Sequence, residues 1–457
     1  MRKIAVIGGG AAGCFCAVNL GRMAPEADIT IFEAGPKLLA KVAVTGGGRC
    51  NYTNTFEAVG DLREVYPRGW QFMRRGLGRF SQEDTVRWFA AEGIRPAIQP
   101  DHCIFPETQD AMHVVRVLER ELRRCGVKVL TGVRISSITE TAWTEETSAP
   151  AVPPAREANN HATPPSQDAK APGYILNGLH GPFDAVVVTS GGGATGMLDG
   201  LGLTIEKPVP SLFTLKTGAV SSQSAGQPSA AGEKKQPSSA KEQSQPTLDI
   251  RSLMGTVVEN AVLRLAGTPF RSEGTLLLTD WGVSGPATLK LSSYAARHLA
   301  DNQYRGTLLI GWLPVSEEEA GALLDTMSRR EPKKQLSTTP PGGITSRLWK
   351  HILLRAGLRD TVTWSELGTK GRARLAARLT ADEYPIAGRC HFKEEFVTCG
   401  GVALSNVKSD TLECRTHPGL YFAGEVLDID AVTGGFNLQA AWTSGYVVAQ
   451  AIAAGGR

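Results

Sequence analysis

The stretch IAVIGGGAAG, Ile4 to Gly13, decides the fold of this chain. A short apolar run enters a glycine cluster that fits the pattern G-x-G-x-x-G at Gly8, Gly10 and Gly13. Such a run is typical of a parallel strand that is buried on both faces. The residues from Ala11 to about Met23 are typical of a helix. We therefore expect a strand, a tight turn and a helix in direct succession.

Each glycine of this unit has a physical role. Gly8 permits the tight turn, Gly10 lets a pyrophosphate approach the backbone, and Gly13 lets the helix lie close to the strand. Ala11 and Ala12 follow at the helix N-terminus, where unpaired N–H groups and the positive dipole end favour phosphate. The unit therefore predicts a phosphate-binding turn.

A second strand, DITIFE, ends at Glu33, twenty residues after Gly13. A carboxylate at this distance accepts hydrogen bonds from ribose hydroxyls, which argues against a 2′-phosphate there. A glycine pattern alone is weak evidence, but the strand, the helix and the acid together predict a dinucleotide site. This unit does not distinguish NAD from FAD.

A second glycine cluster lies in VAVTGGGRCNYTN, Val42 to Asn54. Consecutive glycines can expose several backbone N–H groups in one concave, anion-binding turn, and Arg49 and Asn51 add donors. A second loop facing phosphate or flavin suits an extended FAD molecule better than NAD. Cys50 has no CxxC partner, so we interpret it as a buried packing residue rather than a redox-active thiol.

Bulk composition narrows the function classes. The net charge is +4, from 49 basic and 45 acidic residues, which gives no electrostatic case for a nucleic-acid or anionic-membrane partner. Eight scattered cysteines without a CxxC pair indicate reduced thiols in a cytoplasmic protein. No apolar span of 18 residues occurs, so we expect a soluble protein. The histidines show no metal-ligand spacing, and no metal is expected.

Four blocks carry a resemblance to a known family: GGGAAG, TGGGRCNYTN, LLLTDWGVSGPA (Leu276 to Ala287) and GLYFAGEVLDIDAVTGGFNLQAAWTSGY (Gly419 to Tyr446). They resemble bacterial FAD flavoproteins of the BaiN and aminoacetone-oxidase type, in order over nearly the whole chain. The resemblance implies an α/β fold with a Rossmann-type FAD-binding domain, of the two-dinucleotide-binding-domain flavoprotein type. It also implies an inserted β-rich, barrel-like domain and a small helical subdomain.

The last block also predicts a strand, a turn and a helix. LYFAGE is an apolar strand, and the glycine turn after it opens a helix whose N-terminus can stabilise negative charge on a reduced flavin. The motifs and the resemblance together imply FAD contacts by Gly8, Gly10, Ala11, Ala12, Gly13, Glu33, Lys41, Gly46, Gly47, Gly48, Arg49, Cys50, Asn51, Gly424, Glu425, Gly435, Phe436, Asn437, Leu438 and Gln439. The resemblance alone implies contacts by Val133 (through its backbone, at the adenine end), Ser190, Gly191 and Gly192.

Residues 1–204 and 382–457 are expected to form the FAD-binding domain. Residues 205–314 read as the inserted β-rich domain, with a helix after SGPA that Ser284 caps, and residues 315–381 as the helical subdomain. Two polar stretches, 144–173 and 219–247, lack large apolar groups and are expected to be mobile loops, the first at a hairpin tip.

One departure from the family pattern concerns SGGGATG, which only MLDGLGLTI follows before the next strand-like segment. The family has a longer, helix-bearing stretch there. We therefore expect a differently placed inserted domain and a remodelled substrate pocket. Trp281, Asp280 and Glu425 are candidates for shaping that pocket, but no catalytic acid or base is identified.

The expected function is that of an FAD-dependent oxidoreductase acting on a small organic substrate. Because only one complete dinucleotide fingerprint occurs, NADH or NADPH would dock transiently as the donor. The resemblance includes reductases of unsaturated carbonyl-type compounds and an amine oxidase, and we favour the reductase because no acid/base cluster for amine oxidation is visible. An oxygen-using aminoketone oxidase is the alternative. A tRNA-modifying flavoprotein and a non-catalytic flavin-binding protein are less favoured.

Overall fold

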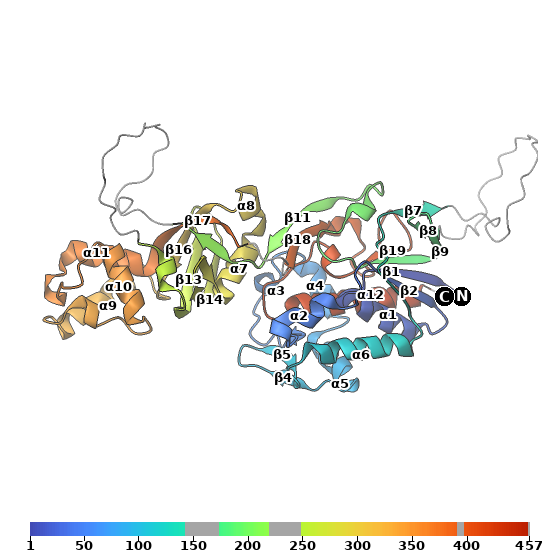
Figure 1. The fold of residues 1–457 in the computed structure, drawn as a ribbon, viewed down its shortest axis with the longest axis horizontal. Helices are drawn as coiled ribbons and strands as arrows, with labels where there is room; N and C mark the ends of the chain where they lie inside the picture. The colour runs from blue at the N-terminus through green and yellow to red at the C-terminus, as the bar shows by residue number, and fades with distance from the viewer. Residues whose placement is uncertain (142–172, 219–247, 391–396, 456–457) are drawn as a thin grey trace, which may run out of the picture. The chain divides into compact units, whose positions relative to one another are not determined.

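A computed structural model describes residues 1–141, 173–218, 248–390 and 397–455. The chain divides into two compact units, Met1–Pro208 with Thr398–Arg457, and Val209–Val397 (Figure 1). The polar stretch 219–247 lies outside the described residues, as does the stretch 144–173 apart from Gly173. Within the described residues, no helix is long and apolar enough to span a membrane.

The first unit is built on a five-stranded parallel sheet (Figure 1). Its strand order is β19-β10-β1-β2-β6, and every neighbouring pair is parallel. Ile4 to Ile7 of β1 are all buried, as a strand covered on both faces requires. The strands are β1 (Lys3–Ile7), β2 (Asp28–Glu33), β6 (Lys128–Thr131), β10 (Ala185–Val188) and β19 (Leu420–Phe422).

Two helices from distant parts of the chain pack together beside this sheet. They are α1 (Ala11–Met23), which contacts β1 and β2, and α12 (Phe436–Ala454), which contacts β19. Gly445 permits their close approach, because a Cβ atom there would come within 2.7 Å of the carbonyl oxygen of Ala12. The predicted helix after the first glycine turn is confirmed, and α6 (Ala111–Arg124) packs against it.

Smaller elements complete the first unit. A three-stranded sheet of order β7-β8-β9 contacts β1 and β10, and another has the order β3-β5-β4. Strands β7 and β8 are antiparallel, with Thr141 opposite Gly173, so a hairpin bounds the first polar stretch as predicted. These elements are α2 (Ala40–Gly48), β3 (Thr53–Asn54), α3 (Leu62–Val65), α4 (Trp70–Leu77), α5 (Gln82–Ala91), β4 (Pro96–Ile98), β5 (Cys103–Pro106), β7 (Ile138–Thr141), β8 (Gly173–Leu176), β9 (His180–Phe183) and the 3₁₀ turn η2 (Gly196–Leu198).

The second unit contains a closed six-stranded barrel of order β12-β15-β14-β13-β16-β17. Leucine and isoleucine side chains such as Leu263, Leu276 and Ile310 fill its core. The predicted β-rich, barrel-like domain is therefore confirmed. Its strands are β12 (Leu215–Thr217), β13 (Val257–Leu265), β14 (Arg271–Leu278), β15 (Gly282–Ser284), β16 (Gly306–Gly311) and β17 (Asp382–Arg389).

The helix after SGPA is α7 (Pro286–Tyr294), followed by α8 (Ala296–Asp301). The prediction that Ser284 caps it is wrong. Gly285 is the N-cap, with φ +91° and no side-chain cap, while Ser284 is the last residue of β15. A Cβ atom at Gly285 would lie 2.8 Å from the carbonyl oxygen of Thr275, so the tight passage from strand to helix requires glycine.

Three helices between β16 and β17 form the helical subdomain: α9 (Glu317–Arg330), α10 (Ser346–Arg355) and α11 (Gly368–Ala381). Asp382, fully buried at the start of β17, accepts hydrogen bonds from Arg355 of α10, at 2.7 Å, and from Trp312 and Tyr384. This network ties the helices to the barrel.

The expected return to the first domain at Asp382 differs from the structure. β17 closes the barrel against β12 and β16, and the chain re-enters the first unit at Thr398. The connecting strands β11 (Ile205–Ser211) and β18 (Val397–Val402) pair with each other. Because closure of a barrel depends on pairing between distant strands, the local sequence at residue 382 does not reveal it.

Candidate functional site

Parallel strands bring their carboxyl ends to one edge of the first sheet, and ligands of open α/β sheets bind there. The first glycine turn follows β1, Glu33 ends β2, Ser190 to Gly192 follow β10, and Gly424 follows β19. Residues that are as far apart in sequence as Gly8 and Gly424 therefore meet at one edge.

The first glycine turn has the geometry expected from its sequence. Gly8 has φ +108°, and a Cβ atom there would lie 2.5 Å from the carbonyl oxygen of Thr189. A Cβ atom at Gly13 would lie 2.0 Å from the carbonyl oxygen of Gly8. At Gly10, by contrast, a Cβ atom would meet no described atom within 4 Å. The turn is therefore closed on the protein side and open where a phosphate would approach.

Helix α1 presents free donors at this opening. Its first intrahelical hydrogen bond runs from the N–H of Cys14 to the carbonyl oxygen of Gly10, and Gly10 provides no side-chain cap. The N–H groups of Ala11, Ala12 and Gly13 consequently have no acceptor within the helix. These donors and the dipole of α1 favour an anion at this point.

The carboxylate of Glu33 is fixed beside the same turn. Its Oε2 accepts a hydrogen bond from the N–H of Gly9 at 2.7 Å, and its Oε1 accepts one from the N–H of Gly35 at 2.6 Å. An ionised carboxylate has about four acceptor sites, so each oxygen keeps one for a ribose hydroxyl. The arrangement fits a dinucleotide whose ribose carries both hydroxyls.

Val133, expected to contact adenine through its backbone, follows β6 next to this carboxylate. Its N–H donates to the carbonyl oxygen of Glu33 at 2.9 Å. The amide is therefore used within the protein, and a backbone contact with adenine would use the carbonyl group of Val133 instead.

The second glycine cluster forms an open, left-handed turn at the end of α2. Gly46, Gly47 and Gly48 have φ values of +58°, +69° and +84°. A Cβ atom at Gly46 would lie 3.0 Å from the backbone nitrogen of Asn51, whereas at Gly47 and Gly48 it would meet nothing within 4 Å. Three glycines are needed because three successive residues are left-handed, and two of them leave the backbone accessible.

Arg49 and Cys50 follow this turn, and Arg49 is exposed whereas Cys50 is buried. The guanidinium of Arg49 lies 4.6 Å from the ring centre of Phe105, and its Nε donates to the carbonyl oxygen of Gly46 at 3.2 Å. The Cys50 side chain is fully buried, and burial raises the pKa of its thiol to about 12. Its full burial agrees with the interpretation of Cys50 as a packing residue.

The same loop is locked to the start of α12. A Cβ atom at Gly435 would lie 2.4 Å from the carbonyl oxygen of Thr53. The side-chain amide of Asn51 bridges the two segments in the orientation that satisfies both of its ends. In that orientation its nitrogen donates to the carbonyl oxygen of Thr53 at 2.7 Å, and its oxygen accepts from the N–H of Gly435 at 3.1 Å. Asn51, expected to donate to the cofactor, thus also positions the helix.

The side chains at the start of α12 are engaged inside the protein. Oδ1 of Asn437 accepts a hydrogen bond from the N–H of Ala431 at 2.9 Å, and Nδ2 of Asn437 donates to the carbonyl oxygen of Ala431 at 3.0 Å. Gln439 is fully buried, and its Oε1 accepts from the hydroxyl of Thr53 at 2.5 Å. Phe436 is buried against Phe56.

The expected flavin contacts of this segment would therefore come from its backbone. The N–H of Gln439 makes the first intrahelical hydrogen bond, to the carbonyl oxygen of Gly435. The N–H groups of Phe436, Asn437 and Leu438 consequently have no acceptor within the helix. They form a second helix N-terminus that favours negative charge.

Glu425 and its neighbours occupy the loop after β19. Oε1 of Glu425 accepts from the N–H of Thr398 at 2.7 Å, and Oε2 lies 3.4 Å from the exposed Nζ of Lys41. Gly424 has φ +75°, and a Cβ atom there would lie 2.7 Å from the Cβ of Ala12. The structure thus brings Lys41 and Glu425, predicted separately, together.

The loop after β10 is short. Ser190 Oγ donates to the carbonyl oxygen of Ala194 at 3.2 Å, Gly191 has φ +76°, and a Cβ atom at Gly192 would lie 2.2 Å from Thr398. The turn η2 follows where a second Rossmann unit would have a helix. Asp280 and Trp281 follow β14 in the second unit.

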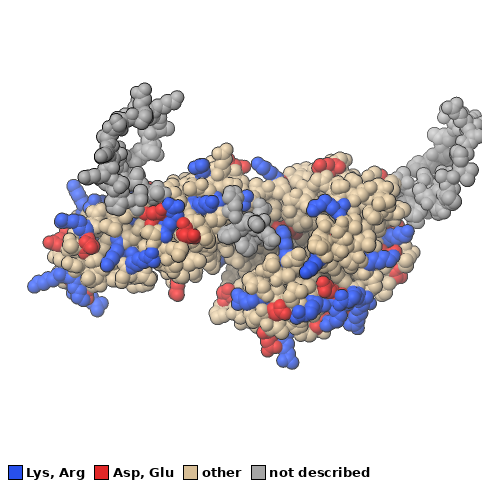
Figure 2. Space-filling view, in the orientation of Figure 1, with Lys and Arg blue, Asp and Glu red and all other residues tan. Residues whose placement is uncertain are grey.

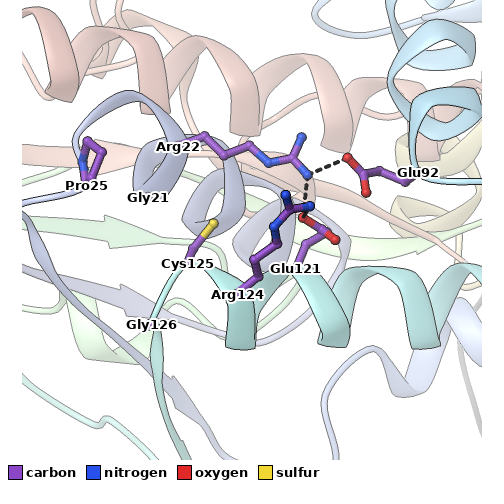
Figure 3. Close-up of a pocket in the computed structure, with 8 residues that line it drawn as sticks. All are labelled: Gly21, Arg22, Pro25, Glu92, Glu121, Arg124, Cys125 and Gly126. Atoms are coloured by element: carbon purple, nitrogen blue, oxygen red, sulfur yellow. Dashed lines mark hydrogen bonds and ion pairs between the residues drawn. The ribbon is translucent and has the colours of Figure 1, made fainter.

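A cavity of about 600 Å³ lies away from this edge, and Figure 3 shows its lining. Arg22, in the last turn of α1, pairs with Glu92 and with the buried Glu121, each at 2.6 Å. Because α1 begins at the glycine turn, its last turn lies at the opposite edge of the sheet. The residues that line the cavity form a structural ion-pair cluster. The candidate functional site therefore remains at the carboxyl edge of the sheet.

Two family models match separate parts of the chain. Residues 2–150 match the family model described as HI0933-like protein Rossmann domain, and residues 242–397 match the one described as HI0933-like protein barrel and H2TH domain. A 3-ketosteroid Δ1-dehydrogenase from Sterolibacterium denitrificans, solved with 1,4-androstadiene-3,17-dione, is 11% identical with a TM-score of 0.44, covering 100% of both chains.

Two curated relatives align over nearly the whole chain. A 3-dehydro-bile acid Δ(4,6)-reductase of Clostridium scindens is 28% identical, covering 99% of both proteins. A ribosomal RNA dihydrouridine synthase of Escherichia coli is 27% identical, covering 97% of this chain and 96% of the relative. Because two models of one family together span more than half of the sequence, the chain belongs to the HI0933-like family of FAD-dependent oxidoreductases, of the BaiN and aminoacetone-oxidase type.

Proposed function

We propose that the protein is an FAD-dependent reductase that saturates a C=C bond conjugated to a carbonyl group, with NADH or NADPH as a transient electron donor. The observation that carries the proposal is the nearly full-length alignment with a relative named a 3-dehydro-bile acid Δ(4,6)-reductase and one named a ribosomal RNA dihydrouridine synthase. In a 3-oxo-Δ4,6 steroid, the double bonds are conjugated to the C3 carbonyl. In uridine, the C5=C6 bond that becomes saturated in dihydrouridine is conjugated to the C4 carbonyl.

The residues at the carboxyl edge would hold the cofactor. The N–H groups of Ala11 to Gly13 would bind the pyrophosphate, Glu33 the adenosine ribose, and the N–H groups at the start of α12 the electron-rich side of the flavin. FAD bound there would supply two-electron transfer between the donor and the conjugated bond. The protein's own part is to bind, to orient and to place positive dipole ends at these points.

The geometry also supports a transient donor. Among the described residues, the complete fingerprint of glycine turn, helix and acid occurs once, at Gly8 to Glu33. The other glycine-rich turn after a sheet strand, Gly191 to Gly193, leads into η2 instead of a long helix. A nicotinamide nucleotide would therefore bind without a Rossmann domain of its own.

Anaerobic mixing tests the proposal. We expect NADH or NADPH to bleach the flavin absorbance near 450 nm, and a 3-oxo-4,6-diene bile acid or a uridine-containing ribosomal RNA to restore it. The alternative is an oxidase that takes electrons from an amine. If neither nucleotide bleaches the flavin, but aminoacetone does and oxygen restores it, the oxidase is correct and this proposal is wrong.

A further inference from the structure

Positive charge is concentrated in one part of the helical subdomain, after the acidic start of α9. From Arg329, in the last turn of α9, to the end of α11, residues 329–381 contain twelve Lys and Arg but three Asp and Glu, a net charge of +9. The other 404 residues, with 37 basic and 42 acidic side chains, carry −5. Figure 2 shows Lys and Arg side chains spread over this end of the second unit, with fewer Asp and Glu among them. The small total charge therefore hides a basic region.

We propose that the exposed faces of α10 and α11 form a docking surface for the phosphate backbone of an RNA. On α10, Arg347, Lys350 and Leu354 are exposed, and the 3.6-residue period places these three on one face. Ser346, at the first position of the helix, is exposed as well. On α11, Lys370 and Arg374 are exposed four residues apart, also on one face. We call Arg347, Lys350, Leu354, Lys370 and Arg374 the basic face.

The two stripes are continuous at the end of α10. Nη1 of Arg374 lies 3.4 Å from the position that a Cβ atom would take at Gly357, two residues after α10 ends. Gly357 is itself exposed, with φ +68°. Arg374 therefore reaches across from α11 and extends the row that begins at Arg347 and Lys350. A helix of ten residues is about 15 Å long, which is long enough to follow several phosphates of one strand.

The cations at the centre of the basic face have no acidic partner in the described structure. Lys350, Lys370 and Arg374 form no ion pair among residues 1–141, 173–218, 248–390 and 397–455, whereas Arg372 pairs with Asp325 and Lys334 with Glu331. Like charges at the spacing of Lys370 and Arg374 destabilise a helix. An arrangement that costs stability in the free protein is relieved when an anion binds.

Three arginines of the first unit, by contrast, have acidic partners. Arg22 and Arg124 line the cavity in Figure 3. Together with Arg120 they pair with Glu92 and Glu121 at distances of 2.6 to 3.7 Å. Two carboxylates offset two of these three positive charges, so the cluster offers less attraction to an outside polyanion.

The basic face also has a rigid base. The opposite side of α10 is buried through Leu348, Trp349 and Ile352, and Arg355 bonds the buried Asp382 of β17. Arg347 is held by hydrogen bonds to the carbonyl oxygens of Ser252 and Met254. The face is therefore presented by a helix fixed to the barrel rather than by a free helix.

RNA is the partner that the observations favour. A row of cations on a rigid helix fits a chain of phosphates, and relatives of nearly equal length are named ribosomal RNA dihydrouridine synthases. An anionic membrane would need apolar side chains to insert beside the cations, and Leu354 is the one large apolar residue of the basic face. The inference rests on the uridine form of the proposed function and adds where the RNA is held.

The test is RNA binding by the oxidised, FAD-loaded protein without an electron donor. The variant Lys350→Glu/Arg374→Glu is compared with Arg75→Glu/Arg123→Glu, which changes the charge equally at exposed cations of the first unit. Binding of a fluorescent hairpin of ribosomal RNA is measured by anisotropy between 50 and 200 mM KCl. We expect the first variant to bind roughly tenfold or more weakly, with a salt slope lower by about 1.5, because each phosphate contact contributes about 0.7 to 0.9.

The control should keep both the affinity and the slope. Unchanged flavin content and melting temperature show that a variant is folded, and Lys350→Gln/Arg374→Gln should give a smaller loss than the charge reversal. The inference would be overturned if both charge reversals weakened RNA binding equally, or if Lys350→Glu/Arg374→Glu did not weaken it. It would also be overturned if that variant lost binding to phosphatidylglycerol vesicles instead of RNA. Reduction of the flavin by NAD(P)H and reduction of a bile-acid probe are measured in parallel. If both reductions occur but the protein does not bind RNA, this inference alone is refuted. If the protein binds RNA but neither reduction occurs, the proposed function alone is refuted.

Discussion

The backbone N–H of Gly9 donates to Oε2 of Glu33 across 2.7 Å, joining the loop after the first strand to the end of the second. With the bond from Gly35 to Oε1, it fixes both oxygens of the carboxylate before any ligand arrives. Two backbone amides, those of Gly9 and Gly35, thus hold the carboxylate of Glu33 in one orientation.

This geometry predicts the effect of Glu33→Gln. The introduced NH₂ group would face the N–H of Gly9 or of Gly35, and the charge would be lost. A hydrogen bond to a charged group contributes about 1.5–3 kcal/mol, so we expect FAD to bind roughly 10- to 150-fold more weakly. Flavin fluorescence on titration measures this. Asp28→Asn, at the other end of β2, is the matched control and should bind FAD normally.

Two glycines of the first turn should respond differently to substitution. At Gly13, any side chain meets the carbonyl oxygen of Gly8, so Gly13→Val should separate α1 from the sheet and lower the melting temperature as well as the flavin content. Gly10 has φ −83° and open space, so Gly10→Ala should fold normally and lose affinity for FAD alone. Thermal unfolding and flavin absorbance separate the two effects. Full FAD occupancy in Gly10→Ala would show that the pyrophosphate lies elsewhere.

The ion-pair cluster around Glu121 should make stability depend on acid pH. Burial alone would raise the pKa of Glu121, but hydrogen bonds from Arg22 and Arg120 outweigh it and hold the pKa below its usual range. A lowered folded-state pKa gives stability that is present above the unfolded value, about 4.3, and is lost as the pH falls through the folded value.

Glu121→Gln should therefore destabilise the protein at pH 7 by about 1–3 kcal/mol and flatten the loss of stability below about pH 4. Urea unfolding followed by tryptophan fluorescence at several pH values checks both effects. Glu107→Gln, at an exposed carboxylate, should change neither. A parallel acid limb in wild type and Glu121→Gln would mean that other carboxylates control acid stability.

The hairpin of β7 and β8 allows residues 142–172 to be replaced. Thr141 and Gly173 are directly opposite each other in the ladder, so a two-residue Asn-Gly turn can join them. We expect the shortened protein to retain its FAD stoichiometry and its flavin reduction by NAD(P)H. Loss of flavin on replacement would show that the polar stretch takes part in the cofactor site.

Features that depend on neighbouring residues could be predicted from the sequence, and features that depend on distant pairing could not. The first glycine turn and α1 follow from spacing alone. The buried role of Gln439 depends on Thr53, 386 positions away, so the pattern GGFNLQ gave no sign that its side chains face inward. The return to the first unit at Thr398 depends on β17 closing a barrel. The net charge, summed over the chain, concealed the contrast between residues 329–381 and the rest.

The pairing of β10 with β19 has a consequence for how the chain emerges from the ribosome. The sheet is interrupted by the whole second unit, so β10 has no outer neighbour until residues 420–422 have been made. At about 5–20 residues per second, synthesis of residues 209–397 takes about 10–40 s. During that interval β10 is an open edge strand, which invites pairing with other chains. The barrel and its helices can fold in the meantime, and the N-terminus of α12 joins the carboxyl edge of the sheet last.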